Sequence, residues 1–237
     1  MGETVSTAMY PFCQETDVKP GQSVLRNVGY ECRNVTEEKE KFFKMWHDYI
    51  HDLAHHKPPG LKVMAFCWTD SRRTGGFMIF DSHESLENFK AGPEKEFNET
   101  IFPLLLDGPA PLFDEACTLW KTKSRKHMID GMNFIRVHTL QAKPGMEEEF
   151  ENWITEKYDF YEWTNDEWLC FNVMKPEPGR YSFAMSFRNA SIIERYMMDE
   201  RQNIDEGELS SLVVGPPAYD VNWIIDGMVY DKEVGGH

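Results

Sequence analysis

The stretch Ala184-Met185-Ser186-Phe187 matches the stretch Phe77-Met78-Ile79-Phe80, which lies 107 residues earlier in the chain. The same offset carries residues 24–120 onto residues 131–227 without a gap. Further pairs at this offset are Phe43 and Phe150, Trp46 and Trp153, Leu86 and Ile193, Phe89 and Tyr196, and Gly108 and Gly215. Two copies are too few for a solenoid, so the sequence predicts a duplicated domain.

Each copy shows the pattern strand, helix, strand, strand, helix, strand. The expected elements of the second copy are residues 133–140, 146–161, 169–174, 181–187, 191–198 and 221–229. Those of the first copy are residues 24–33, 37–54, 62–69, 76–81, 84–90 and 115–121. This order predicts an α+β fold of two tandem ferredoxin-like βαββαβ repeats. Because helices cover one face of each antiparallel sheet, we expect the two sheets to pack face to face as a barrel within one chain.

The repeat also sets the expected domain boundaries. They are an N-terminal arm at 1–22, a first repeat at 23–121, a linker at 122–130, a second repeat at 131–230 and a C-terminal tail at 231–237. One chain then supplies both halves of the barrel, which predicts a monomer or a homodimer.

Composition limits the kinds of partner. The chain has 237 residues, a formal net charge of −15 and 41% hydrophobic residues. Such acidity argues against a nucleic-acid partner, because phosphate binding needs clustered Lys and Arg. No apolar run reaches the roughly 18 residues of a membrane span, so we expect no membrane partner and a cytoplasmic location. Five scattered cysteines without CxxC spacing favour reduced thiols over disulfides or structural zinc.

Strand parity predicts which side chains face the space between the sheets. Met78 with Met185 and Phe80 with Phe187 are shared by the copies, so they are assigned to the helix-covered side of the third strand. In the first strand the apolar pairs are Val28 with Ile135 and Tyr30 with Val137. The alternate residues, expected in the pocket, are Glu31, Arg33, Phe77, Ile79, Arg136, His138, Asn172, Ser186, Arg188 and Asn222. The alternative is a solvated strand edge with a salt bridge between the copies, because a one-residue slip reverses every side.

Histidines recur every fourth residue in the first expected helix, at His47, His51 and His55. On a helix these three share one stripe. They fit an exposed histidine face, a metal site, or a single general base, for which His51 is the candidate. No HExxH pattern accompanies them, and we expect no metal. The second copy places Tyr158 at the position equivalent to His51.

A family resemblance adds to this interpretation. The segment Lys143-Pro144-Gly145-Met146-Glu147-Glu148-Glu149-Phe150 at the start of a helix, with residues 184–187 before the next, resembles the dimeric α+β barrel superfamily. Its members include antibiotic-biosynthesis-type monooxygenases, muconolactone-type isomerases and haem-binding chlorite-dismutase-like proteins. Trp46 with His51, followed by Ala65-Phe66, is also similar to a segment of the bacterial ferredoxin-like chalcone isomerases. Those enzymes use a histidine base and no cofactor.

Together these features favour a cofactor-independent lyase or isomerase acting on a small aromatic or phenolic molecule. His51 or His138 would move a proton, with Tyr158 as a partner, and Arg136 or Arg33 would hold a carboxylate or developing oxyanion. One alternative is a haem-binding, chlorite-dismutase-like oxidoreductase. The others are a cofactor-free monooxygenase and a barrel that binds a ligand without catalysis. No dinucleotide, P-loop or GxSxG signature is present in the sequence.

Overall fold

The computed structural model describes most of both predicted repeats. The described residues are 9–10, 18–31, 44–45, 48–49, 52–53, 56, 58–68, 73–105, 111–124, 134–160, 168–188, 191, 207–217 and 219–230. Within them, only the backbone is described at 9–10, 100–105, 123–124, 157–160, 168 and 219–230.

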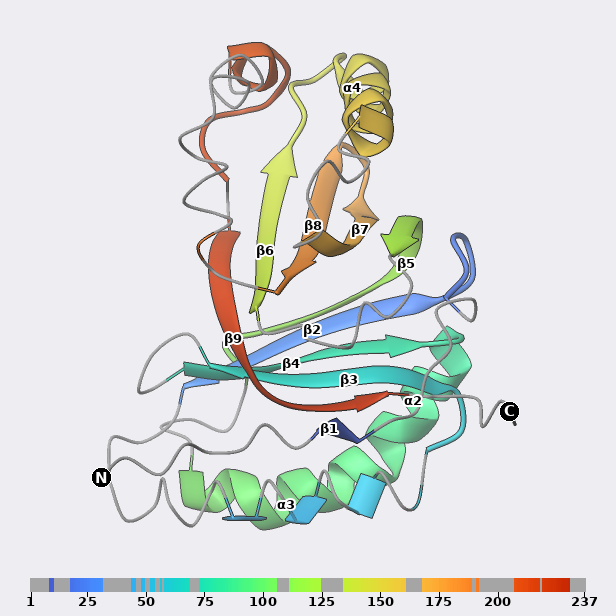
Figure 1. Ribbon diagram of the computed structural model, residues 1–237, viewed down its shortest axis with the longest axis vertical. Coiled ribbons are helices and arrows are strands. Elements are labelled where there is room, and N and C mark those ends of the chain that lie inside the picture. Colours follow the sequence, from blue (N-terminus) through green and yellow to red (C-terminus); the bar gives the residue numbers. More distant parts are fainter. Residues whose placement is uncertain are drawn as a thin grey trace. The chain divides into compact units, whose positions relative to one another are not determined.

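The element order confirms an α+β fold whose strands are mostly antiparallel, with β1 and β9 forming a parallel pair (Figure 1). The elements of the first half are β1 (Met9–Tyr10), β2 (Val24–Glu31), β3 (Leu61–Trp68), β4 (Arg73–Phe80), α2 (His83–Ala91), α3 (Pro93–Leu105) and β5 (Phe113–Ser124). The elements of the second half are β6 (Phe134–Gln141), α4 (Glu147–Phe160), β7 (Trp168–Glu177), β8 (Arg180–Phe187) and β9 (Tyr219–Tyr230). Residues 44–45, 48–49 and 52–53 are also helical, and we call them the N-terminal helical segment. None of the described helices combines the length and apolar character needed to cross a membrane.

The chain forms two compact units whose boundaries differ from those of the predicted repeats. Unit 1 comprises Met1–Thr118 and Ile224–His237, and unit 2 comprises Leu119–Trp223. The strand order is β1-β9-β3-β4-β2-β5 in unit 1, and unit 2 contains β5-β7-β8-β6 with β9 also paired to β6. The strands β5 and β9 therefore contribute to both units. The expected linker at 122–130 begins inside β5, and the expected tail at 231–237 lies outside the described residues.

The two units repeat each other closely in some strands and differ in one. The bounds of β4 and β8 are 107 residues apart at both ends. The first strands are displaced, because Val24 pairs with Phe80 in unit 1, whereas Phe134 pairs with Phe187 in unit 2. Val24 and Phe134 are 110 residues apart, which is three more than the sequence offset. An odd displacement moves every side chain of the strand to the other face of the sheet.

Helices cover one face of the sheet in each unit. In unit 1, Leu86 and Phe89 of α2 pack on Phe80, with the two phenylalanine ring centroids 5.3 Å apart. In unit 2, Phe150 of α4 meets Tyr181 edge-on at 4.9 Å. Both cores consist of buried aromatic and aliphatic side chains. Burying one large apolar side chain contributes about 1.5–3 kcal/mol.

The helix α3 was not predicted from the sequence. It begins at Pro93, and its first turn carries Glu94 and Glu96. Proline lacks the amide hydrogen that is unsatisfied at a helix start, and acidic residues are favourable at that end of the helix dipole. These two features are the signal that identifies α3, and the helix forms one wall of a groove in unit 1.

Candidate functional site

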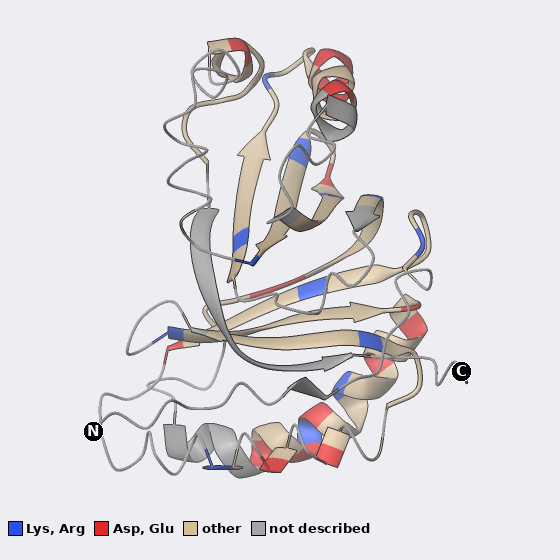
Figure 2. Ribbon diagram, in the orientation of Figure 1, with Lys and Arg blue, Asp and Glu red and all other residues tan. Residues whose placement is uncertain are grey.

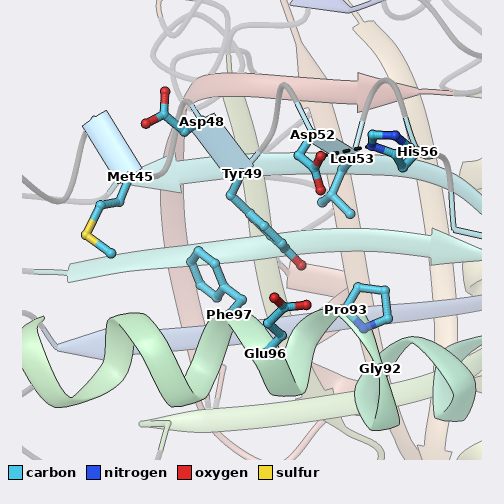
Figure 3. Close-up of a pocket in the computed structure, with 10 residues that line it drawn as sticks. All are labelled: Met45, Asp48, Tyr49, Asp52, Leu53, His56, Gly92, Pro93, Glu96 and Phe97. Atoms are coloured by element: carbon cyan, nitrogen blue, oxygen red, sulfur yellow. Dashed lines mark hydrogen bonds and ion pairs between the residues drawn. The ribbon is translucent and has the colours of Figure 1, made fainter.

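A groove of about 690 Å³ lies in unit 1 between the N-terminal helical segment and the corner where α2 meets α3 (Figure 3). Its lining residues are Met45, Asp48, Tyr49, Asp52, Leu53, His56, Gly92, Pro93, Glu96 and Phe97. Two helices therefore supply nearly all of its walls, and the lining combines apolar side chains with a small number of polar groups. Ligand sites commonly have this composition.

The apolar part of the groove centres on two stacked rings. Tyr49 and Phe97 lie with centroids 4.2 Å apart and planes at 30°, so the two helices meet through aromatic contact. Leu53 is buried beside them and Met45 is partly exposed. This wall suits a flat apolar ligand, because aromatic rings favour offset stacking.

The polar part of the groove contains a histidine held by a carboxylate. His56 Nδ1 and Asp52 Oδ1 are 2.9 Å apart, and the backbone amide of His56 donates to the Asp52 carbonyl at 2.7 Å. A carboxylate can only accept, so in the neutral ring Nδ1 carries the proton and Nε2 keeps its lone pair. Both side chains are largely exposed. The pair can therefore accept a proton from a molecule in the groove.

The groove carries negative rather than positive charge among its described lining residues. Asp48, Asp52 and Glu96 are acidic, and the described lining contains neither Lys nor Arg. Asp48 is paired with Lys44, which lies outside the lining, at 2.9 Å. Further acidic residues lie within α2 and α3 (Figure 2). An anionic ligand would find no cationic partner in this part of the groove.

The phenol of Tyr49 stays protonated in this environment. Its hydroxyl is buried, and burial together with the negative charge of Glu94 raises its pKa far above the ordinary value for tyrosine. A neutral phenol donates a hydrogen bond and does not act as a base.

Two predicted pocket residues of unit 2 lie on the other side of the sheet from the one expected. His138 pairs with Phe183 and Arg136 pairs with Met185, so both share the side that α4 covers. The ring of His138 stacks on Phe183, with centroids 4.8 Å apart. The cause is the three-residue displacement of β6, which reverses the side inferred from a gapless alignment. The expected apolar partners Ile135 and Val137 lie on the opposite side instead.

Other predicted residues are brought together within each unit. In unit 2, Asn172 and Ser186 share the side of the sheet away from α4, and Cys170 pairs with Ser186. Asn172 Nδ2 donates to Cys170 Sγ at 3.1 Å, while Ser186 Oγ is buried without a hydrogen-bond partner among the described residues. In unit 1, Glu31, Phe77 and Ile79 share the side of the sheet away from the helices. Their roles in binding stay predictions.

Several predicted residues cannot be placed in the same detail. Arg33 and the histidines His47, His51 and His55 lie outside the described residues. Tyr158 lies in α4 and Asn222 in β9, where only the backbone is described. Arg188 directly follows β8 and is partly exposed. In the described part of the chain, no group of three or more His, Cys, Asp or Glu could hold a metal ion.

Solved structures with this fold are numerous, although sequence comparison finds none of its relatives. No protein-family model matches the chain, and no curated protein sequence matches it. A protein of Fusobacterium nucleatum provisionally described as a monooxygenase is similar at a TM-score of 0.69 and 11% identity, over 89% of this chain and 95% of that one. An anthrone oxidase-like protein is similar at 0.60 and 14%, over 92% and 96%. A protein provisionally described as a chlorite dismutase is similar at 0.58 and 6%, over 86% and 95%.

These comparisons correct the expected enzyme class. The similar structures are described as a monooxygenase, an oxidase-like protein and a chlorite dismutase, and not as lyases or isomerases. The expectation of a cofactor-independent lyase or isomerase was therefore wrong, and the narrower resemblance to chalcone isomerases finds no support. At these identities the likeness shows the fold alone. The chain shares the ferredoxin-like α+β fold of these structures.

Proposed function

We propose that the protein oxidises a small, non-anionic aromatic molecule with molecular oxygen, in the groove of unit 1 and without a bound cofactor. The observation that carries the proposal is the His56–Asp52 pair, 2.9 Å apart, in the same groove as the stacked rings of Tyr49 and Phe97. The names of the similar monooxygenase and anthrone oxidase-like structures support oxygen chemistry over other uses of such a groove.

Different residues of the groove have different roles in the proposed reaction. Tyr49 and Phe97 hold the aromatic body, and Asp52 orients His56 so that Nε2 removes a proton from a methylene group made acidic by the rings beside it. Tyr49, whose buried hydroxyl stays neutral, adds no negative charge to the wall on which the aromatic body stacks. The resulting electron-rich carbon reduces oxygen.

The overall reaction balances without another reductant. Two C–H bonds of the methylene and the O–O bond break, one oxygen atom forms the new carbonyl, and the other leaves as water. The carbon is oxidised by four electrons and oxygen is reduced by four. The substrate therefore supplies every electron, and no further reductant has to bind.

The groove of unit 1 does not suit a haem. The two haem propionates would face Asp48, Asp52 and Glu96, where the described lining offers no Lys or Arg. No step of the proposed reaction passes through haem.

The test measures oxygen uptake with anthrone, a neutral aromatic methylene compound. We expect one oxygen molecule consumed per anthrone, with one atom of ¹⁸O₂ appearing in the product carbonyl. His56→Gln should lower kcat by about 10²-fold or more, because a positioned general base contributes that much. Phe97→Ala should mainly raise KM. His83→Gln is the matched control, since His83 is an exposed histidine on α2 outside the groove. An uptake rate that His56→Gln leaves unchanged would rule out this mechanism.

A further inference from the structure

A buried ion network lies under the helices of unit 1. Arg26 Nη1 is 2.6 Å from Glu94 Oε1, and Arg26 Nε and Nη2 are 2.6 and 2.8 Å from the two carboxylate oxygens of Asp114. The side chain of Arg26 is only 3% exposed. A single planar guanidinium therefore joins β2 to α3 through Glu94 and to β5 through Asp114.

Arg26 and Asp114 remain charged in this network. Burial alone lowers the pKa of Arg26, but the hydrogen bonds and negative charges of Asp114 and Glu94 outweigh it and raise that pKa. Burial also works against ionisation of Asp114, yet Arg26 holds the pKa of that carboxyl below its ordinary value. Removing one partner would leave an uncompensated charge inside the unit.

Glu94 connects the network to the groove. It is the second residue of α3, and Pro93, Glu96 and Phe97 around it line the groove at spacings that share one face of a helix. Its own side chain turns toward the sheet, where it binds Arg26. The charge of Glu94 also contributes, after burial, to the raised pKa of Tyr49. The same helical turn thus contacts Arg26 on one side and the groove on the other.

We propose that Arg26 is a positioning residue for the groove, acting through Glu94 on the first turn of α3. The fork of the guanidinium fixes the rotation of that turn and so the distance between Phe97 and Tyr49. The Asp114 arm holds β5, which contributes no described residue to the groove. The inference rests on the proposed function in one respect, namely that the groove is the binding site.

The two carboxylates that bind Arg26 allow a matched pair of variants. Glu94→Gln and Asp114→Asn each remove one carboxylate charge from the same guanidinium while keeping side-chain volume. The probe is N-phenyl-1-naphthylamine, a neutral aromatic compound whose fluorescence rises in apolar surroundings. Its Kd is measured with the full chain by titration, and the unfolding midpoint of each variant is measured in urea.

We expect both variants to lower the unfolding midpoint and only Glu94→Gln to weaken the probe, by about tenfold, because misplacing a binding wall is costly. Asp114→Asn should change Kd by less than about threefold, since its arm does not reach α3. If Glu94→Gln does not fold, Arg26→Lys, which keeps the charge and loses the fork, should weaken the probe instead. Equal effects of the two arms on Kd would overturn the positioning role.

One further variant distinguishes the positioning role of Arg26 from the proposed oxidation. Phe97→Ala should abolish probe binding. A probe that binds equally well to Phe97→Ala would show that the groove is not the site, and both proposals would fall. Weakening by Glu94→Gln alone, in a protein that consumes no oxygen, would support the positioning role and reject the oxidase.

Discussion

The imidazole of His138 lies flat against the ring of Phe183, with the ring centroids 4.8 Å apart and the planes at 10°. The two residues are direct cross-strand neighbours on β6 and β8. A polar side chain thus completes an aromatic layer under α4.

This contact predicts that the protein tolerates replacement of His138 by an apolar aromatic residue and is destabilised by its replacement with a charged one. His138→Phe should change the free energy of unfolding by less than about 1.5 kcal/mol, because stacking on Phe183 is kept. His138→Asp should cost about 2 kcal/mol or more, since a carboxylate would be partly buried. Urea unfolding gives both values, and Asn152→Asp on the exposed side of α4 is the control, expected within about 0.5 kcal/mol. Equal tolerance of Phe and Asp at His138 would place that side chain in solvent.

Breaking the buried network should be far more costly than breaking a surface pair. Arg26→Met leaves Glu94 and Asp114 without their cation, and we expect a loss of about 3–5 kcal/mol in the free energy of unfolding. Lys95→Met removes the exposed pair with Glu99, whose nearest atoms are 3.8 Å apart, and should cost less than about 1 kcal/mol. Denaturant midpoints compare the two, and similar losses would show that the network is open to water.

The same network predicts acid sensitivity of unit 1. The folded pKa of Asp114 lies below its ordinary value of 3.8, so its contribution to stability is present above pH 3.8 and lost as the pH falls through the folded pKa. Asp114→Asn should therefore be less stable than the natural protein at pH 7, and the gap should narrow as the pH falls below about 4. Unfolding midpoints between pH 2.5 and 7 measure this, and a gap that is constant with pH would contradict it.

Two glycines with the same backbone conformation should differ in their response to alanine. Gly60 and Gly145 have φ of +78° and +82°, where a side chain is strained at either position. A Cβ at Gly60 would also clash with Ser85 Oγ and Asp81 Oδ1, whereas nothing lies within 4 Å of a Cβ at Gly145. We expect Gly145→Ala to cost about 1 kcal/mol and Gly60→Ala at least about 1 kcal/mol more. Equal losses in thermal unfolding would show that Ser85 moves aside freely.

The strand pattern was largely predictable because both copies alternate clearly. The bounds expected for β3 and β8 differ from those observed by one residue at most. The repeat could not predict which face of the sheet each side chain of β6 occupies. The chain between Phe134 and its partner Phe187 is shorter than the chain between the corresponding paired residues of unit 1, and this difference displaces the strand. Periodicity records alternation along one strand and carries no information on the register between strands.

The candidate site was less predictable than the fold. The histidine pattern directed attention to His47, His51 and His55, whereas the groove is lined by their neighbours Asp52 and His56. The second wall was missed, because Phe97 lies in a helix that the sequence analysis did not assign. Arg26 was missed as well, although a charged residue at the same parity as Val24 and Val28 indicates a buried ion pair. Its partners lie 68 and 88 residues away, beyond any local pattern.

The division of β9 between the two units has a consequence for biosynthesis. The sheet of unit 1 is complete only when Ile224–Tyr230 pairs with β3, so a nascent chain emerging from the ribosome cannot close its first unit until Tyr230 has been made. Until then β3 presents an unpaired edge of backbone amides and carbonyls. A gene cut at the repeat boundary would encode a first half with that edge permanently exposed, and such a half would aggregate.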